Sequence, residues 1–395
     1  MKSKNIILTL LLFIATSAFA QQNLFISQDI KSAEVNSDNS VTFRMIAPNA
    51  KKVQIAGDFA EKADQTISGL VGTGLMDMQK VTDSLWTYTT KPLPSELYSY
   101  VFMVDGVSTI DPNNPYVIRD FATLSNIFLV GNGQADLYAV KEVVHGTLSH
   151  RWYHSDALNL TRRINVYTPA GYESSNKKYP VLYLLHGMGG DEDEWVNFGR
   201  ATQILDNLIA QGKAVPMLVV MPNGHAMMEA APGESSLGYY KPYHFQKGTM
   251  DGIFEQDFPE IIKFIESNYR VVADKQHRAI AGLSMGGFHA MNISRYYENT
   301  FDYVGLFSAA LLKMNDATGK VYSNIDETLL KQKQNGVKLY WTGIGSEDFL
   351  YKANQEFRAK LDKIGMKYTY VETGGGHIWK NWRIYLSQFA PQLFK

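Results

Sequence analysis

Cysteine is absent from this chain of 395 residues, and neither charge sign is in excess, with 38 basic and 39 acidic side chains. The absence of cysteine excludes disulfide bonds, thiolate metal ligands and attachment of lipid to a leader cysteine. A net charge of −1 provides no field that favours nucleic acid or an anionic membrane surface. Beyond the N-terminal segment, no apolar run is long enough to span a bilayer, so no membrane insertion is expected.

The N-terminal segment has the pattern of a secretory signal peptide. Lys2 and Lys4 give it a positive start, and a short apolar run over residues 6–15 follows. Ala18-Phe19-Ala20 then supplies the small residues of a cleavage site. We expect cleavage near Ala20 and export to the periplasm or the medium. An uncleaved anchor is the alternative.

The length predicts two domains, because a chain of 395 residues exceeds what one hydrophobic core usually organises. Residues 23–137 alternate apolar and polar side chains, with turn residues such as Pro48 and Gly106 between the runs. This pattern, without a stretch of helical length, predicts an all-β immunoglobulin-like sandwich. The clearest strand candidates are residues 41–45, 53–57, 85–89, 98–104 and 126–130.

Residues 143–395 alternate strands with segments of helical length, which predicts an α/β fold with a mostly parallel sheet. Several strand candidates are apolar throughout, as strands buried on both faces must be. Strands are expected at 163–167, 181–185, 217–221, 279–281, 303–307 and 338–341, and helices at 202–211 and 253–268.

Gly282-Leu283-Ser284-Met285-Gly286 matches the G-x-S-x-G pattern of a nucleophilic serine. The pattern alone is common, but here it follows a short apolar strand and precedes a helix-like stretch. That setting is typical of the α/β-hydrolase fold, in which a tight turn exposes the serine hydroxyl. The alternative is a plain glycine-rich turn.

The serine requires a base, because its hydroxyl is almost fully protonated near neutral pH. In this fold the catalytic residues follow in the order serine, acid, histidine. His377 lies in a loop after three glycines, downstream of an expected strand at 367–372. Glu347 and Asp348 both lie just past the preceding strand, and from the residues alone either one qualifies as the acid.

Backbone N–H groups are expected to stabilise the oxyanion of the reaction. Met285, directly after the serine, offers one of them. The loop after the strand at 181–185 offers the second, with Met188 preferred and Gly187 close behind, while His186 is expected to hold this loop. The histidines are scattered without a metal-binding pattern, so neither a metal nor a cofactor is expected.

Taken together, these motifs resemble the feruloyl and acetyl-xylan esterases of carbohydrate esterase family one, from about His145 to the C-terminus. The resemblance implies that Asp348, in a G-x-x-D turn, is the acid. It also implies an esterase acting on feruloylated or acetylated xylan oligosaccharides. The N-terminal part is similar to the early-set, carbohydrate-binding-module-like sandwich often fused to such enzymes. The motifs lie at 183–187, 191–195, 278–287, 345–349 and 374–377.

The substrate is expected to contact the aromatic-rich segment 223–250, which can wall a pocket for a planar acid. The alternative is a loop whose aromatic residues pack for its own stability. The candidate binding residues are Trp195, Asn223, Tyr239, Tyr240 and Trp379.

Three other functions fit the same sequence. Siderophore esterases acting on catecholate esters also join a sandwich to this hydrolase type, and mycolyl-transferring enzymes are related acyltransferases. A non-catalytic carbohydrate-binding protein is the third. The sandwich itself either binds glycan or braces the hydrolase part, and bracing is favoured. The sequence does not give the oligomeric state.

Overall fold

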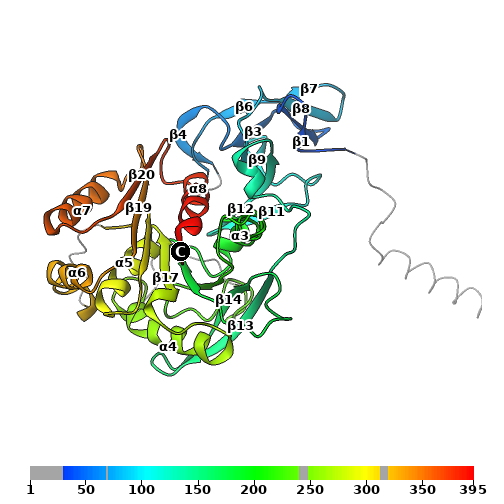
Figure 1. Cartoon of the computed structure of the whole chain (residues 1–395). Helices are drawn as coiled ribbons and strands as arrows, with labels where there is room; N and C mark the ends of the chain where they lie inside the picture. The colour runs from blue at the N-terminus through cyan, green and yellow to red at the C-terminus, as the bar shows by residue number, and fades with distance from the viewer. Residues whose placement is uncertain (1–29, 68–69, 240–247, 312–318) are drawn as a thin grey trace, which may run out of the picture.

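The computed structural model describes residues 30–67, 70–239, 248–311 and 319–395. The expected signal peptide and Tyr240 lie outside these residues. Figure 1 shows strands β1, β3, β6, β7 and β8 at the top, with β11 and β12 lower down beside α3 of the larger part. Within the described residues, every helix falls short of the length and apolarity that a membrane crossing requires.

The N-terminal part is all-β, as predicted. One sheet has the strand order β1-β2-β8-β7, and a second has the order β11-β12-β9-β3-β6, with β10 paired to β9. A small pair, β4-β5, completes it. The strands are β1 (Glu34–Val35), β2 (Val41–Ile46), β3 (Val53–Gly57), β4 (Lys62–Ile67), β5 (Leu70–Thr73), β6 (Leu75–Asp77), β7 (Gln79–Lys80), β8 (Leu85–Thr89), β9 (Glu96–Val104), β10 (Val107–Thr109), β11 (Val117–Asp120) and β12 (Thr123–Val130).

Aromatic side chains fill the space between the two N-terminal sheets. Phe43 of β2 contacts Tyr100 of β9 and Phe128 of β12, with ring centroids 4.8 and 5.4 Å apart. All three side chains are buried. Because these residues come from both sheets, this part has the sandwich architecture that the alternating pattern predicts.

The C-terminal part is built on an eight-stranded sheet with the order β13-β14-β16-β15-β17-β18-β19-β20. Strands β15 to β20 pair in parallel, while β14 pairs antiparallel with β13 on one side and with β16 on the other. This is the predicted α/β fold. Its strands are β13 (Thr147–Ser155), β14 (Leu160–Thr168), β15 (Val181–Leu185), β16 (Leu218–Pro222), β17 (Arg278–Leu283), β18 (Tyr303–Phe307), β19 (Leu339–Gly345) and β20 (Thr369–Thr373).

Helices cover both faces of this sheet. Because side chains alternate along a strand, Val181, Tyr183 and Leu185 of β15 point to one core and Leu182 and Leu184 to the other. The first core includes residues of α4, α5, α6 and α7, and the second includes residues of α3 and α8. The helices are α2 (Glu194–Asn197), α3 (Ala201–Ala210), α4 (Ile253–Asn268), α5 (Met285–Tyr296), α6 (Ile325–Gln334), α7 (Tyr351–Ile364) and α8 (Trp379–Phe389), with short 3-10 turns η1 (Gln134–Leu137), η2 (Lys275–His277), η3 (Lys320–Tyr322) and η4 (Ala390–Gln392).

The sandwich and the α/β part share a buried interface. Arg383 of α8 donates to Glu96 Oε1 through Nε and Nη2, at 3.2 and 3.0 Å, and both side chains are 2% exposed. Its Nη2 also donates to Leu97 O at 3.0 Å. Leu97 and Tyr138 belong to the same apolar core as α3 and α8. Separating the two parts would leave the buried guanidinium of Arg383 without its carboxylate, which is strongly destabilising. This contact therefore holds the two parts together.

Candidate active site

Ser284 occupies a strained turn between β17 and α5, with φ 51° and ψ −115°. The turn is tight because a Cβ at Gly286 would lie 2.4 Å from Leu185 O and 2.5 Å from His186 O. A Cβ at Gly282 would lie 2.4 Å from the carbonyl of Gly286, so glycine is required at both positions. Strain of this kind persists where the surroundings enforce it, and it marks functional turns. Ser284 is partly exposed, while its neighbours Leu283 and Met285 are buried.

His377 and Asp348 form a hydrogen-bonded pair. The distance between His377 Nδ1 and Asp348 Oδ2 is 2.9 Å, and Asp348 Oδ1 accepts from the Leu350 N–H at 2.9 Å. Burial alone raises the pKa of Asp348, but the hydrogen bond and charge of His377 and the Leu350 N–H outweigh it and lower the pKa below its usual value. Asp348 therefore carries a negative charge at neutral pH and holds the Nδ1 side of the imidazole.

Glu347, the other acid that the sequence allows, faces elsewhere. Its carboxylate pairs with Lys62 of β4, and both side chains are more than half exposed. The hydrogen bond from Lys62 lowers the pKa of Glu347. The turn therefore directs Asp348 to His377 and Glu347 to the sandwich.

The three residues gather at one edge of the sheet. Ser284 follows β17, Asp348 follows β19 and His377 follows β20, and these strands run parallel. Their C-terminal ends therefore lie at the same edge. Backbone hydrogen bonds tie the loops together: Ser284 N–H donates to Phe307 O at 2.9 Å, and Glu347 N–H donates to Gly375 O at 2.9 Å.

The loop after β15 is fixed by His186. Burial lowers the pKa of His186 to about 4, so the ring is neutral near pH 7. Its Nε2 accepts from the Gly224 N–H at 2.7 Å, which leaves Nδ1 as the donor to Gly187 O, also at 2.7 Å. In a planar trans peptide the following N–H points away from the carbonyl, so the Met188 N–H points away from His186. Gly187 lies beside Ser284, because a Cβ at Gly187 would be 3.4 Å from the serine Cβ.

Two of the expected substrate contacts are wrong. Trp195 is 1% exposed and donates its indole N–H to Leu185 O at 2.9 Å, so it belongs to the core beneath the loop. Asn223 is also 1% exposed, donating to Glu192 Oε2 and accepting from the His225 N–H, both at 2.9 Å. Both side chains are occupied by internal partners and neither is available to a ligand.

The other aromatic candidates differ in exposure. Tyr239 is 97% exposed, whereas Trp379 is half-buried and stacks on Phe198 with ring centroids 5.6 Å apart. Trp382, on the same helix as Trp379, is 6% exposed and lies against His377. The described part of segment 223–250 therefore offers Tyr239 as an exposed aromatic side chain.

Phe349 is a surface residue beside the site, and no motif in the sequence indicates this position for it. Its side chain is 75% exposed, and its ring centroid lies 4.7 Å from that of His377. An aromatic residue directly after the acid suggests packing of the turn against the sheet. The side chain points outward instead, because its neighbour Asp348 points inward. Ile378, the residue after His377, is also exposed, at 42%.

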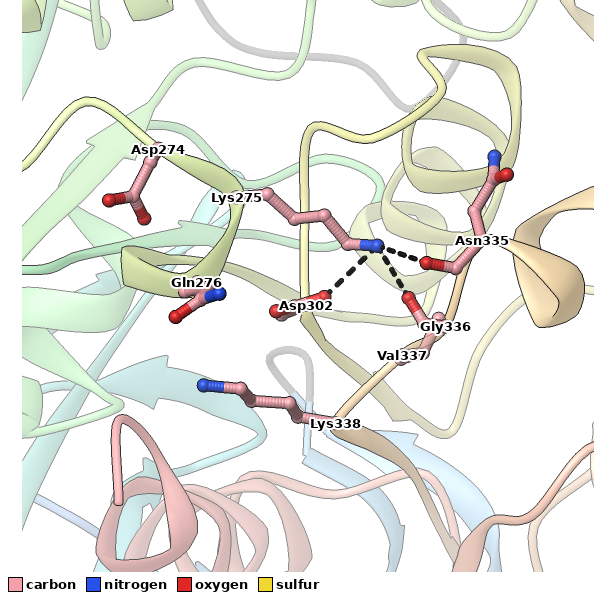
Figure 2. A pocket seen from close by; sticks show the side chains of 8 residues that line it. All are labelled: Asp274, Lys275, Gln276, Asp302, Asn335, Gly336, Val337 and Lys338. Atoms are coloured by element: carbon pink, nitrogen blue, oxygen red, sulfur yellow. Dashed lines mark hydrogen bonds and ion pairs between the residues drawn. The ribbon is translucent and has the colours of Figure 1, made fainter.

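Other features of the described residues offer no alternative centre. They contain no group of three or more acidic or histidine side chains able to hold a metal. A cavity of about 570 Å³ lies where β17, β18 and β19 begin, at the edge of the sheet away from Ser284 (Figure 2). Lys275 donates there to Asn335 O and Gly336 O at 2.7 and 2.6 Å and pairs with Asp302. The ammonium group therefore links the loops that line the cavity.

Comparisons with known proteins support the same fold and chemistry. Residues 155–393 match the family described as "Putative esterase". A protein of Xylanibacter ruminicola named endo-1,4-beta-xylanase/feruloyl esterase is 32% identical over 91% of this chain and 46% of its own length. An acetyl esterase of Caldicellulosiruptor saccharolyticus is 26% identical over 54% of this chain and 82% of its own. The chain spans less than half the length of several curated relatives that it matches.

Two solved structures are similar in fold. A ferulic acid esterase is 30% identical, with a TM-score of 0.52 over 63% of this chain and 97% of its own. The enterobactin esterase of Shigella flexneri is 17% identical, with a TM-score of 0.61 over 90% of this chain and 93% of its own. The second likeness extends over both the sandwich and the α/β part and shows a shared fold.

Proposed function

The chain belongs to the esterase family, whose model matches residues 155–393, and on that premise we propose that it is a serine carboxylesterase. It removes feruloyl or acetyl groups from xylan-type polysaccharides. The pair of His377 and Asp348, at the same sheet edge as the strained Ser284, carries the proposal. These are the nucleophile, base and acid that ester hydrolysis through an acyl-enzyme requires.

In this mechanism His377 takes the proton of Ser284 as the serine oxygen attacks the ester carbonyl. The N–H groups of Met285, at the start of α5, and of Met188 stabilise the oxyanion of the tetrahedral intermediate. Collapse of the intermediate breaks the ester bond, and His377 passes its proton to the departing alcohol. Water, deprotonated by His377, then attacks acyl-Ser284, which releases the acid and restores the serine. Asp348 holds the imidazole and offsets its positive charge.

The choice of substrate rests on the relatives and on the surface beside His377. A relative at 32% identity is named as a feruloyl esterase, and a solved structure at 30% identity is a ferulic acid esterase. The exposed ring of Phe349 supplies a flat apolar surface next to the reacting centre, which suits a planar phenolic acid. Export after cleavage near Ala20, which brings the enzyme to such polysaccharides, is part of the proposal.

Initial rates on methyl ferulate, methyl caffeate and acetylated xylan, measured side by side, test the substrate. We expect turnover of the feruloyl or the acetyl ester, with a catecholate triester as a slower comparison. Faster cleavage of the triester assigns a siderophore esterase instead. An added alcohol that becomes esterified assigns an acyltransferase, and failure of a serine-reactive phosphonate to label the protein assigns a non-catalytic role.

Phe349→Ala should raise KM for methyl ferulate by about 2- to 10-fold, the equivalent of one aromatic contact. KM for a small acetyl ester should change less, because an acetyl group is too short to cover the ring. Steady-state kinetics on both esters measure the difference.

Tyr116→Ala is the matched control, since Tyr116 is 70% exposed on the sandwich and has no place in the proposed mechanism. Equal changes in KM for the two esters would show that Phe349 acts through His377 and not by contacting the acyl group.

A further inference from the structure

The turn that joins β11 and β12 carries an unusual residue. Asp120 pairs with Thr123 across the two strands, which leaves Phe121 and Ala122 as the connection. Phe121 has φ 54°, in the left-handed region that such turns normally fill with glycine or asparagine. A bulky residue there is strained, and the strain persists only because the surroundings hold it.

The ring of Phe121 lies on the loop that carries Met188. A Cβ at Gly189 would be 2.4 Å from Phe121 Cδ2, so the ring directly covers the residue after Met188. Arg119, two residues before Phe121, donates to Phe121 O at 2.9 Å and also pairs with Asp191 at the end of the loop. The turn therefore contacts this loop at two points, Gly189 and Asp191.

The same turn reaches the segment that carries His377. The carboxylate of Asp120 interacts with the side chain of Trp379, which begins α8 two residues after His377. Trp379 in turn packs against Trp195, with ring centroids 5.5 Å apart, beneath the loop after β15. One turn of the sandwich thus touches both the oxyanion side and the histidine side of the site.

We propose that residues 119–121 are positioning residues of the esterase site, and that the sandwich takes part in catalysis through them. The inference rests on the proposed function. Its reason is geometric: oxyanion stabilisation requires N–H groups held in place before the reaction, and a misplacement of about 1 Å costs as much as 10²-fold in rate. Phe121 blocks displacement of Gly189, and with it displacement of the Met188 N–H. This goes beyond bracing, which requires only the buried Arg383–Glu96 contact.

Phe121→Gly in the full chain is the decisive variant, because it separates the ring from the strain. Glycine adopts φ 54° freely, so the turn should keep its fold while the contact with Gly189 is lost. We expect kcat on a small soluble ester to fall by about 10- to 100-fold with KM little changed, and the melting temperature to stay near that of the wild type. Phe121→Tyr retains the ring and should restore kcat.

Leu124→Ala is the matched control on the same hairpin, since Leu124 is 49% exposed and pairs with Arg119 in register. It should leave both kcat and KM unchanged. If Phe121→Gly keeps wild-type kcat, or if Phe121→Tyr loses as much as the glycine variant, the inference is wrong. A wild-type protein that neither hydrolyses esters nor reacts with a phosphonate contradicts the proposed function itself, which is a separate result.

Discussion

Ser284→Ala should reduce kcat by about 10³-fold or more, because no other group supplies the nucleophile of the acyl-enzyme. The fold should survive, since Ser284 is partly exposed at a turn and its side chain fills no core volume. Alanine meets the same strain as serine at φ 51°, so the elbow itself is not changed. Rates on a soluble aryl ester, with circular dichroism and a melting curve on the same samples, measure both effects.

Ser346→Ala provides the control for this variant. Ser346 is exposed in the turn that holds Asp348, at the same sheet edge, but its hydroxyl has no place in the mechanism. It should retain wild-type turnover, and a phosphonate should label it while leaving Ser284→Ala unlabelled. A Ser284→Ala protein that keeps more than a tenth of the wild-type kcat is incompatible with the assigned nucleophile.

The helices and strands that could be predicted are those whose limits are marked by residues within the element itself or directly beside it. The strands at 181–185 and 303–307 and the helix at 253–268 have the predicted bounds, because uninterrupted apolar runs and turn residues mark their limits. Strand β13 was not predicted. It lies at the edge of the sheet, and its mixture of polar and aromatic side chains follows from solvent on one side.

The sequence indicates the proposed site only where the motifs are local. The G-x-S-x-G turn and the glycine-flanked His377 are visible in the sequence, whereas the roles of the tryptophans depend on partners far along the chain. Trp195 is buried because its indole N–H donates to Leu185 O and its ring packs against Trp379. No pattern around residue 121 indicates that Phe121 lies on Gly189, since this contact depends on how two separately folded sheets meet.

The two acids of the turn after β19 should differ sharply in effect. Asp348→Asn should lower kcat by about 10²- to 10⁴-fold with KM less changed, because an amide cannot offset the charge of the imidazolium and favours the wrong tautomer of His377. Glu347→Gln should leave kcat nearly unchanged. It removes only the exposed pair with Lys62, and pairs of this kind contribute little to stability.

Steady-state kinetics of the two variants on one soluble ester decide the assignment, with Lys62→Met as the matched control for loss of the surface pair.

The hydrogen bonds of Asp348 explain why the two variants should differ in kcat. Asp348 accepts from both the Leu350 N–H and His377, so the asparagine variant retains an oxygen acceptor but replaces the other oxygen with an NH₂ group. If that NH₂ faces His377, it donates to Nδ1 and cannot accept the Nδ1 proton, which favours the opposite tautomer of the imidazole. Burial alone raises the pKa of Asp348, but the hydrogen bond and charge of His377 more than compensate, so the carboxylate should stay charged over the neutral range. Should Glu347→Gln prove the more damaging change, the acid is Glu347 and the turn must rearrange in solution.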